Sequence, residues 1–282
     1  MADFLATMAA GSLRRLEAAR AARSMDRLMR LVEDASPAPR LSLAGGFDVI
    51  AEIKATSPAE GALADATDFD PTARATAYAT GGAAAVSVLT EPDRFSGTLE
   101  HLAAAARVLA GHDVPAMRKD FLVDDYQVVE ARLAGAGGVL AIVAMLDDAA
   151  LANLTARAAE LGLFVLVECF DAEDTSRASR LVDTRAGTEL AKAGQLLVGV
   201  NTRDLRTLAV DNERLERLVD YLPRELPRVA ESGLKVPVDA ARAVGMGYDV
   251  ALIGTALMRR EDATEAVVEF VEAGRAAAGV GA

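Results

Sequence analysis

Apolar and polar positions follow two alternating spacings along most of the chain. From about residue 47 onward, short segments rich in valine and leucine recur near residues 47–53, 84–90, 114–118, 138–146, 164–170, 196–201, 228–231 and 250–254. Between them, apolar residues return every three or four positions, as in 98–110, 126–133 and 147–161, which is the spacing of amphipathic helices. Eight strands alternating with helices favour an α/β protein, a (β/α)8 TIM barrel.

A doubly wound open sheet has the same alternation and is the competing fold. That fold typically carries a glycine-rich phosphate loop directly after its first strand, where the glycines let the backbone approach the ligand. The first predicted strand is followed here by Ser57-Pro58-Ala59-Glu60-Gly61, which lacks that pattern. The sequence therefore favours the barrel.

Residues 1 to about 36 precede the first strand and have helical periodicity, and the segment Ser36-Pro37-Ala38-Pro39 ends the predicted helix. Such a helix packs on the surface of the domain or lies across one end of the barrel, and the pattern leaves both arrangements open. We expect a single domain, with an N-terminal helical extension over 1–46, the barrel over 47–260 and a C-terminal helix over 261–282.

Composition narrows the class of protein. Of the 282 residues, 52% are hydrophobic, which is enough for a large core, and the apolar run 134–145 is too short to span a membrane. No charged leader with an apolar stretch precedes the fold, and the single cysteine, Cys169, is typical of a reducing compartment. We expect a soluble cytoplasmic protein with no membrane partner. The net charge of −12 argues against nucleic acid as a partner.

Lysine is rare in this chain. Lysine and arginine together number 30, yet the lysines are only Lys54, Lys119, Lys192 and Lys235. A desolvated lysine can give up a proton near neutral pH, whereas arginine holds its proton. Lys54 and Lys119 both fall at the ends of predicted strands, so they are candidates for proton transfer.

Most of the predicted strands end in polar residues, and in a TIM barrel the carboxyl ends of the strands form the active site. Glu52 and Lys54 are two positions apart and so share a face, as do Asn201 and Arg203. A structural ion pair is the alternative for Glu52 and Lys54. The other polar or glycine residues at strand ends are Lys119, Glu168, Glu231, Ser232, Gly233, Gly254 and Thr255. The glycines bind a phosphate through backbone N–H groups or merely permit tight turns.

Seven segments, in the order of the chain, carry a resemblance to a known family: A-E-I-K-x-x-S-P, V-L-T-E-P, M-R-K-D-F, L-V-E, V-N-x-R-D-L, A-E-S-G and L-I-G-x-x-L-M. Together they resemble indole-3-glycerol phosphate synthase of tryptophan biosynthesis. The resemblance runs from about residue 47 to 260, and the N-terminal helix is similar to the extension that these enzymes carry.

The resemblance implies a carbon–carbon lyase that closes the indole ring of 1-(2-carboxyphenylamino)-1-deoxyribulose 5-phosphate, with loss of carbon dioxide and water. It implies no metal and no cofactor. Lys119 is similar to the family's general acid and Glu168 to its second acid–base group. Lys54 would serve the phosphate, the reacting centre or both, and Glu52 and Asn201 would orient these groups.

The resemblance also implies which residues bind the substrate. Arg203 would hold the carboxylate, and Glu231 and Ser232 would line the site. The phosphate would be bound by Ser57, Gly233, Gly254 and Thr255. The aromatic ring would be bound by Phe95, Phe121, Leu140 and Leu205, although an ordinary core position explains the pattern of these four equally well.

Two parts of the chain differ from the sequence that is usual in this family. After Lys54 the family commonly has a basic residue, and this chain has Ala55-Thr56. After Ser57-Pro58 the family commonly has Ser-Lys, and this chain has Ala59-Glu60, so we expect weaker attraction of a doubly charged substrate. Residues 183–194 make the passage before the sixth strand longer than is usual, and we expect a surface excursion on the helix side, away from the site.

Two other functions stay open at this point. One is isomerisation of a related phosphorylated anthranilate sugar, which needs a different acid–base pair. The other is a barrel that binds a phosphorylated ligand without turnover. In each case the expected partner is a phosphorylated small molecule, and the chain is expected to act as a monomer or a weak homodimer.

Overall fold

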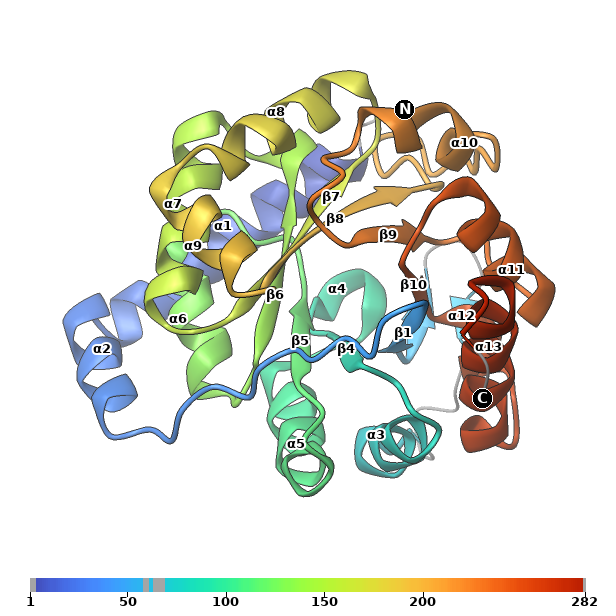
Figure 1. Ribbon diagram of the computed structural model, residues 1–282. Helices are drawn as coiled ribbons and strands as arrows, with labels where there is room; N and C mark the ends of the chain where they lie inside the picture. Colours follow the sequence, from blue (N-terminus) through green and yellow to red (C-terminus); the bar gives the residue numbers. More distant parts are fainter. Residues whose placement is uncertain (1–3, 58–60, 63–68, 281–282) are drawn as a thin grey trace.

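The computed structural model describes residues 4–57, 61–62 and 69–280, and Figure 1 shows a ring of strands surrounded by helices. Eight parallel strands close a barrel in the order β1–β10–β9–β8–β7–β6–β5–β4. Their bounds are β1 Asp48–Ile53, β4 Ala85–Leu89, β5 Ala116–Lys119, β6 Gly138–Ile142, β7 Phe164–Cys169, β8 Leu196–Asn201, β9 Arg228–Glu231 and β10 Val250–Ile253. Because β1 pairs with β10 on one side and with β4 on the other, the sheet has no edge. The predicted TIM barrel is confirmed and the open sheet is excluded.

One predicted strand is clearly shorter in the structure. The segment 138–146 was expected to be one strand, but β6 ends at Ile142 and a short 3₁₀ helix, η2, covers Val143–Met145. The carbonyl groups of Val143 and Leu146 accept hydrogen bonds from Arg177 instead of from a neighbouring strand. An apolar run continues through this turn because Val143 is buried, so hydrophobicity alone did not mark the end of the strand.

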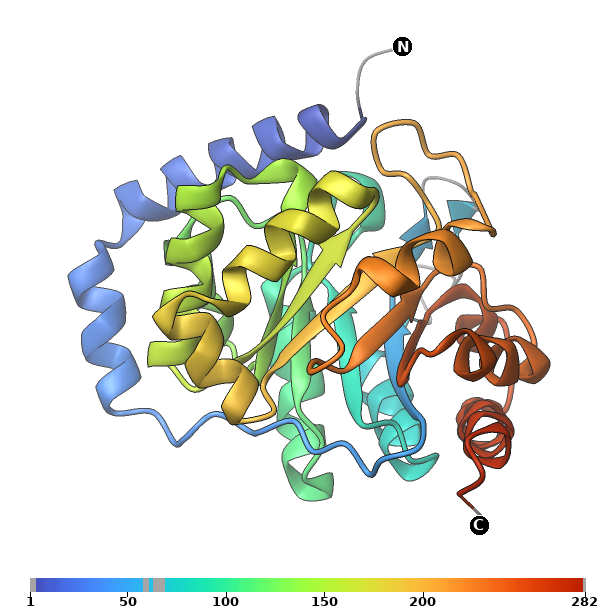
Figure 2. The ribbon, with the colours of Figure 1, turned by 45° about the horizontal axis from the view of Figure 1, so that its top comes forward.

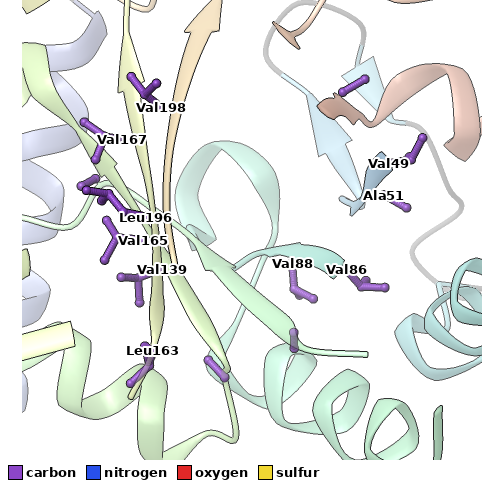
Figure 3. Close-up of a cluster of buried hydrophobic side chains, with 14 of the residues drawn as sticks. Val49, Ala51, Val86, Val88, Val139, Leu163, Val165, Val167, Leu196 and Val198 are labelled. Atoms are coloured by element: carbon purple, nitrogen blue, oxygen red, sulfur yellow. The ribbon is translucent and has the colours of Figure 1, made fainter. Parts of the chain in front are cut away.

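Side chains on the strands alternate between two apolar layers. Those that point outward pack against the helices, and Figure 3 shows part of this layer, including Val49, Ala51, Val165, Val167 and Val198. The side chains at the intervening positions fill the interior of the barrel and include Ile50, Met117, Leu166, Leu197 and Val229. Since one strand position in two faces inward, the last inward position of each strand reaches the carboxyl end of the barrel, where the site forms.

Helices follow the strands around the barrel. Their bounds are α3 Pro71–Thr80, α4 Pro92–Phe95, α5 Leu99–Leu109, α6 Asp125–Leu133, α7 Asp148–Glu160, α8 Ala172–Val182, α9 Arg185–Lys192, α10 Arg214–Leu218, α11 Pro237–Met246, α12 Thr255–Met258 and α13 Ala263–Ala277. Two further 3₁₀ helices are η1 Ala110–His112 and η3 Val219–Tyr221, and a two-stranded sheet joins β2 Thr56–Ser57 to β3 Gly61–Ala62. Helix α13 packs against α11 and α3 and thus closes the ring of helices. No helix in the described ranges is long and apolar enough to cross a membrane.

The N-terminal extension forms two helices, α1 Phe4–Ala22 and α2 Met25–Glu33, so the expectation of one continuous helix was wrong. The break falls at Arg23 and Ser24, where Ser24 has an extended backbone and begins α2. Figure 2 shows α1 lying across one end of the barrel, while the segment between α2 and β1 runs along the other end. Leu41 in that segment exchanges two hydrogen bonds with the Gln195 side chain, just before β8.

Residues 183–194 lie on the outside of the barrel, as expected, but they are packed. They contain α9, which contacts α7 and α8, and Leu190 on α9 is only 4% exposed. Thr184 caps the helix by accepting a hydrogen bond from the Gly187 N–H. This segment therefore belongs to the helical layer of the barrel.

Candidate active site

Lys119 lies at the centre of the carboxyl end of the barrel. Lys119 is the last residue of β5, and its Nζ lies 3.3 Å from Glu168 on β7, 3.6 Å from Glu231 on β9 and 4.0 Å from Glu52 on β1. Burial works to lower the pKa of Lys119, but these three carboxylates outweigh it and raise the pKa above its ordinary value. Lys119 is therefore protonated throughout the neutral range.

Glu52 lies between two lysines. Its Oε1 is 2.7 Å from Lys54 Nζ, and its other oxygen faces Lys119. Burial works to raise the pKa of Glu52, but Lys54 and Lys119 outweigh burial and hold that pKa below its ordinary value. Both side chains of the E-x-K pair thus point into the site, because residues two apart on a strand share a face.

Glu168 and Glu231 are buried beneath Lys119, with exposed fractions of 0%. Among the described residues, Glu168 Oε1 and both oxygens of Glu231 have no hydrogen-bond partner. Burial and the neighbouring Glu168 carboxylate raise the pKa of Glu231 well above its ordinary value. The space for Glu231 comes from Gly199 on β8, since a Cβ at that position would lie 2.2 Å from Glu231 Oε1.

These charged groups lie at the base of a cavity of about 630 Å³ that opens at the carboxyl end of the barrel. Of the residues predicted to form the site, those on its wall are Glu52, Lys54, Lys119, Asn201, Arg203, Ser232, Gly233, Gly254, Thr255, Phe95, Phe121, Leu140 and Leu205. Glu168 and Glu231 lie beneath that wall, where both contact the Lys119 ammonium that lines the cavity. A cavity of this size suits a small organic molecule.

Ser232 and Gly233 form a tight turn after β9. Both have left-handed backbone, with φ of 64° and 79°, which is uncommon for serine and easy for glycine. This turn brings the backbone of Gly233 to the cavity wall, close to Thr202 and Asn212. Backbone N–H groups in a turn of this kind can bind an anion.

Gly254 after β10 has a second reason to be glycine. A Cβ at this position would lie 2.1 Å from Glu52 Oε1 and 2.9 Å from Lys54 Nζ. Any side chain there would displace the ion pair of β1. Gly254 therefore makes room for Lys54 as well as exposing backbone to the cavity.

The apolar part of the wall contains three aromatic rings. The Phe95 and Phe121 ring centroids are 6.2 Å apart with a tilt of 37°, and Phe4 on α1 meets Phe121 edge to face, also at 6.2 Å. Leu140 and Leu205 complete the apolar surface. This geometry can hold a planar ring between aromatic faces.

Asn201 is the last residue of β8, and Arg203 comes two positions later. Asn201 Oδ1 accepts a hydrogen bond of 2.9 Å from the Arg203 N–H, which leaves the amide NH₂ of Asn201 to face the cavity. The Arg203 side chain donates to the Leu208 carbonyl at 3.4 Å, in a loop held by a bridge between Arg203 and Val210. The guanidinium lowers the pKa of Glu52, although less than the two lysines do.

Strand order places the polar and the aromatic walls opposite each other. The turns after β9 and β10 carry Gly233 and Gly254, whereas Phe95, Phe121 and Leu140 follow or belong to β4, β5 and β6. In the closed order, β9 and β10 face β5 and β6 across the barrel. Lys119 and Glu52 lie between the two walls.

The first loop is only partly described. Ala59 and Glu60 lie outside the described residues, as does the side chain of Ser57, whose backbone belongs to β2. Ala55 is 8% exposed, and Thr56 donates hydrogen bonds to Arg94 O and Ser96 Oγ. The start of this loop therefore rests on the loop after β4.

Within the described ranges, no group of three His, Cys, Asp or Glu side chains is arranged to hold a metal ion.

Several wall residues escaped prediction from the sequence. They include Phe4, Asp120, Leu208, Val210, Asn212, Lys235 and Arg259. Lys235 had a usable signal, because it is one of four lysines and follows the Gly233 turn by two residues. Asp120 directly follows Lys119. Phe4 carries no local signal, since its position depends on how α1 docks.

Solved structures share the fold at low sequence identity. A 3-hexulose-6-phosphate synthase matches with a TM-score of 0.58 and 18% identity, covering 82% of this chain and 99% of that one. Tryptophan synthase from M. tuberculosis matches with a TM-score of 0.55 and 14% identity, covering 81% of this chain and 93% of that one. These likenesses support the barrel fold alone.

Relatives in sequence are far more similar. A family model described as indole-3-glycerol phosphate synthase matches residues 5–270. A protein of that name from Nocardioides sp. is 48% identical over 224 residues, covering 79% of this chain and 80% of its own length. One from Mycobacterium leprae is 42% identical over 244 residues, covering 85% of this chain and 84% of its own length. The chain belongs to the indole-3-glycerol phosphate synthase family.

Proposed function

We propose that this chain closes the indole ring of 1-(2-carboxyphenylamino)-1-deoxyribulose 5-phosphate and releases carbon dioxide and water. The observation that carries the proposal is Lys119, a half-buried cation in contact with carboxylates from three strands, between an aromatic wall and a polar wall of glycines. Ring closure by this route needs an acid at the ketone oxygen and an acid–base group for the departing hydroxyl. It also needs groups that bind a carboxylate and a phosphate.

In the proposed reaction, the ring carbon that bears the carboxylate attacks the ketone carbon, and Lys119 protonates the ketone oxygen as the carbon–carbon bond forms. The carbon–carboxylate bond then breaks. Carbon dioxide leaves, and the electron pair of the broken bond returns to the aromatic ring. Loss of the new hydroxyl as water, together with a ring proton, completes the indole. Glu168, 3.3 Å from Lys119, is placed to take or return protons in these steps.

The remaining groups bind and orient the substrate. Glu52 fixes Lys54 and faces Lys119, and Lys54 adjoins Gly254 on the polar wall, so Lys54 serves both phosphate and reacting centre. Arg203 holds the carboxylate and the free amide of Asn201 donates to a hydroxyl. Glu231 and Ser232 line the site. The phosphate is held by Ser57, Gly233, Gly254 and Thr255, and the aromatic ring by Phe95, Phe121, Leu140 and Leu205.

Two further points complete the proposal. We propose that the chain acts as a monomer or weak homodimer, and sedimentation of the purified protein tests this. The single cysteine is buried and free, which suits the cytoplasm. We place the activity in tryptophan biosynthesis or a specialised indole pathway.

A direct assay tests the function. Purified protein incubated with the carboxyphenylamino-deoxyribulose phosphate should produce indole fluorescence and an equal amount of carbon dioxide. The isomerase alternative predicts turnover of the phosphoribosyl anthranilate precursor instead. The binding-only alternative predicts saturable binding of the substrate with neither product, and either result would replace the proposed reaction.

A further inference from the structure

A guanidinium from the N-terminal helix reaches two carboxylates behind the aromatic wall. Arg15 on α1 places Nη2 2.9 Å from Asp120 Oδ1 and Nη1 3.6 Å from Glu91 Oε1. Both carboxylate side chains are only 1% exposed, while that of Arg15 is 28% exposed. Gly11, one turn earlier on α1, lies close to Arg15 and to Asp93 of α4, so the helix passes directly over this region.

Each carboxylate also holds the backbone of one aromatic wall residue. Asp120 Oδ1, the oxygen that Arg15 binds, accepts a hydrogen bond of 2.8 Å from the Phe121 N–H. Glu91 accepts hydrogen bonds from three consecutive N–H groups, the last of them that of Phe95, and so caps α4. The backbones of Phe95 and Phe121 are therefore each anchored to a carboxylate, and Arg15 contacts both carboxylates.

Both carboxylates have hydrogen-bond donors other than Arg15. Asp120 Oδ2 accepts hydrogen bonds from Arg118 Nη2 at 3.1 Å and from Thr90 Oγ1 at 2.8 Å. Glu91 keeps the N–H groups of α4 that it caps. Loss of Arg15 would thus remove the described ion pair of Glu91 but leave both buried carboxylates hydrogen-bonded, so we expect the fold to persist. What it would lose is the only bridge among the described residues that joins these two carboxylates.

We propose that Arg15 is a positioning residue for the ring pocket, which fixes the separation of Phe95 and Phe121 by bridging Glu91 and Asp120. The inference rests on the proposed function, since it names the group that these rings hold as the anthranilate ring. Because misplacing a binding surface by about 1 Å is sufficient to cost roughly 10²-fold in rate, a bridge of this kind has a measurable effect. The polar wall after β9 and β10 does not contact Arg15 and should be unaffected.

The test compares Arg15→Met with Arg20→Met. Arg20 is the matched control, because it lies on the same helix and binds an aspartate, Asp124, at 2.7 Å, yet neither residue lines the cavity. The probes are anthranilate for the ring pocket and inorganic phosphate for the polar wall, each measured by equilibrium binding, which needs no turnover. The indole assay on the parent protein tests the proposed reaction itself, so its failure can be told apart from failure of the Arg15 proposal.

We expect Arg15→Met to weaken anthranilate binding roughly tenfold and to change phosphate binding less than twofold. Arg20→Met should change neither. Arg15→Lys, whose single ammonium reaches only one carboxylate, should fall between, and it carries the test with the same expected direction if Arg15→Met does not fold. The proposal is overturned if anthranilate binding is unchanged, if both ligands weaken equally, or if Arg20→Met matches Arg15→Met.

Discussion

The Lys119 ammonium lies 3.3 Å from Glu168, although their strands, β5 and β7, are separated by β6. The contact spans the interior of the barrel and brings a permanent donor next to a carboxylate that is 0% exposed. Three acidic side chains around Lys119 outweigh burial and raise its pKa, which favours the protonated ammonium in the free enzyme. This relationship is the centre of the proposed chemistry.

Gly254 should be more sensitive to substitution than Gly233. In Gly254→Ala the new Cβ would meet Glu52 Oε1 at 2.1 Å and displace the pair with Lys54, so kcat should fall by roughly 10²-fold. In Gly233→Ala the nearest atom is Thr202 Oγ1 at 3.1 Å, and the effect should appear in KM. Steady-state kinetics of both variants decide this, and equal effects on kcat would contradict the assignment.

Glu231 should make the fold less stable as pH rises. Above the ordinary carboxyl pKa the unfolded chain releases the Glu231 proton, whereas the folded chain keeps it because the pKa of Glu231 is raised. The free energy of unfolding therefore falls as pH rises from the ordinary pKa toward the raised pKa. Glu231→Gln cannot ionise and should therefore gain stability over the parent, by about 1.4 kcal/mol for each pKa unit crossed.

Urea unfolding of Glu231→Gln and the parent at pH 5 and pH 8 measures this difference. The gain should be larger at pH 8. A difference that stays constant with pH would show that Glu231 ionises equally in both states.

Leu190 tests the role of residues 183–194. Because its side chain is buried where α9 packs on α7, Leu190→Ala should lower the free energy of unfolding by ~2–5 kcal/mol. No residue of this segment lines the cavity, so KM and kcat at low temperature should stay unchanged. A marked change in either constant in the folded variant would mean that α9 communicates with the site.

The sequence predicted the inner ring of the site because strand periodicity decides which side chains face inward. Glu52, Lys119, Glu168, Asn201 and Glu231 all sit at the last inward positions of their strands. Their clustering follows from the closed barrel alone. Family resemblance then supplied the chemical role that periodicity cannot give.

The contributions of α1 could not be predicted in the same way. Phe4 reaches the ring pocket, and Arg15 the carboxylates behind it, only because α1 crosses the mouth of the barrel. That crossing is set by tertiary contacts such as the hydrogen bond from Phe4 N to Arg206 O. The helix that starts at Phe4 shows ordinary periodicity, and nothing local distinguishes a helix on the rim from one on the side. The break at Ser24 was missed for a similar reason, since no proline or glycine marks it.

The replacement of Lys119 by arginine tests the central claim most directly. Arginine keeps the positive charge opposite Glu168, Glu231 and Glu52 but holds its proton too firmly to act as an acid. If Lys119 donates a proton to the ketone oxygen, Lys119→Arg should lose on the order of 10²-fold or more in kcat, while circular dichroism shows an unchanged fold. The same substitution at Lys54 should be milder. Near-normal turnover in a folded Lys119→Arg enzyme would contradict the account.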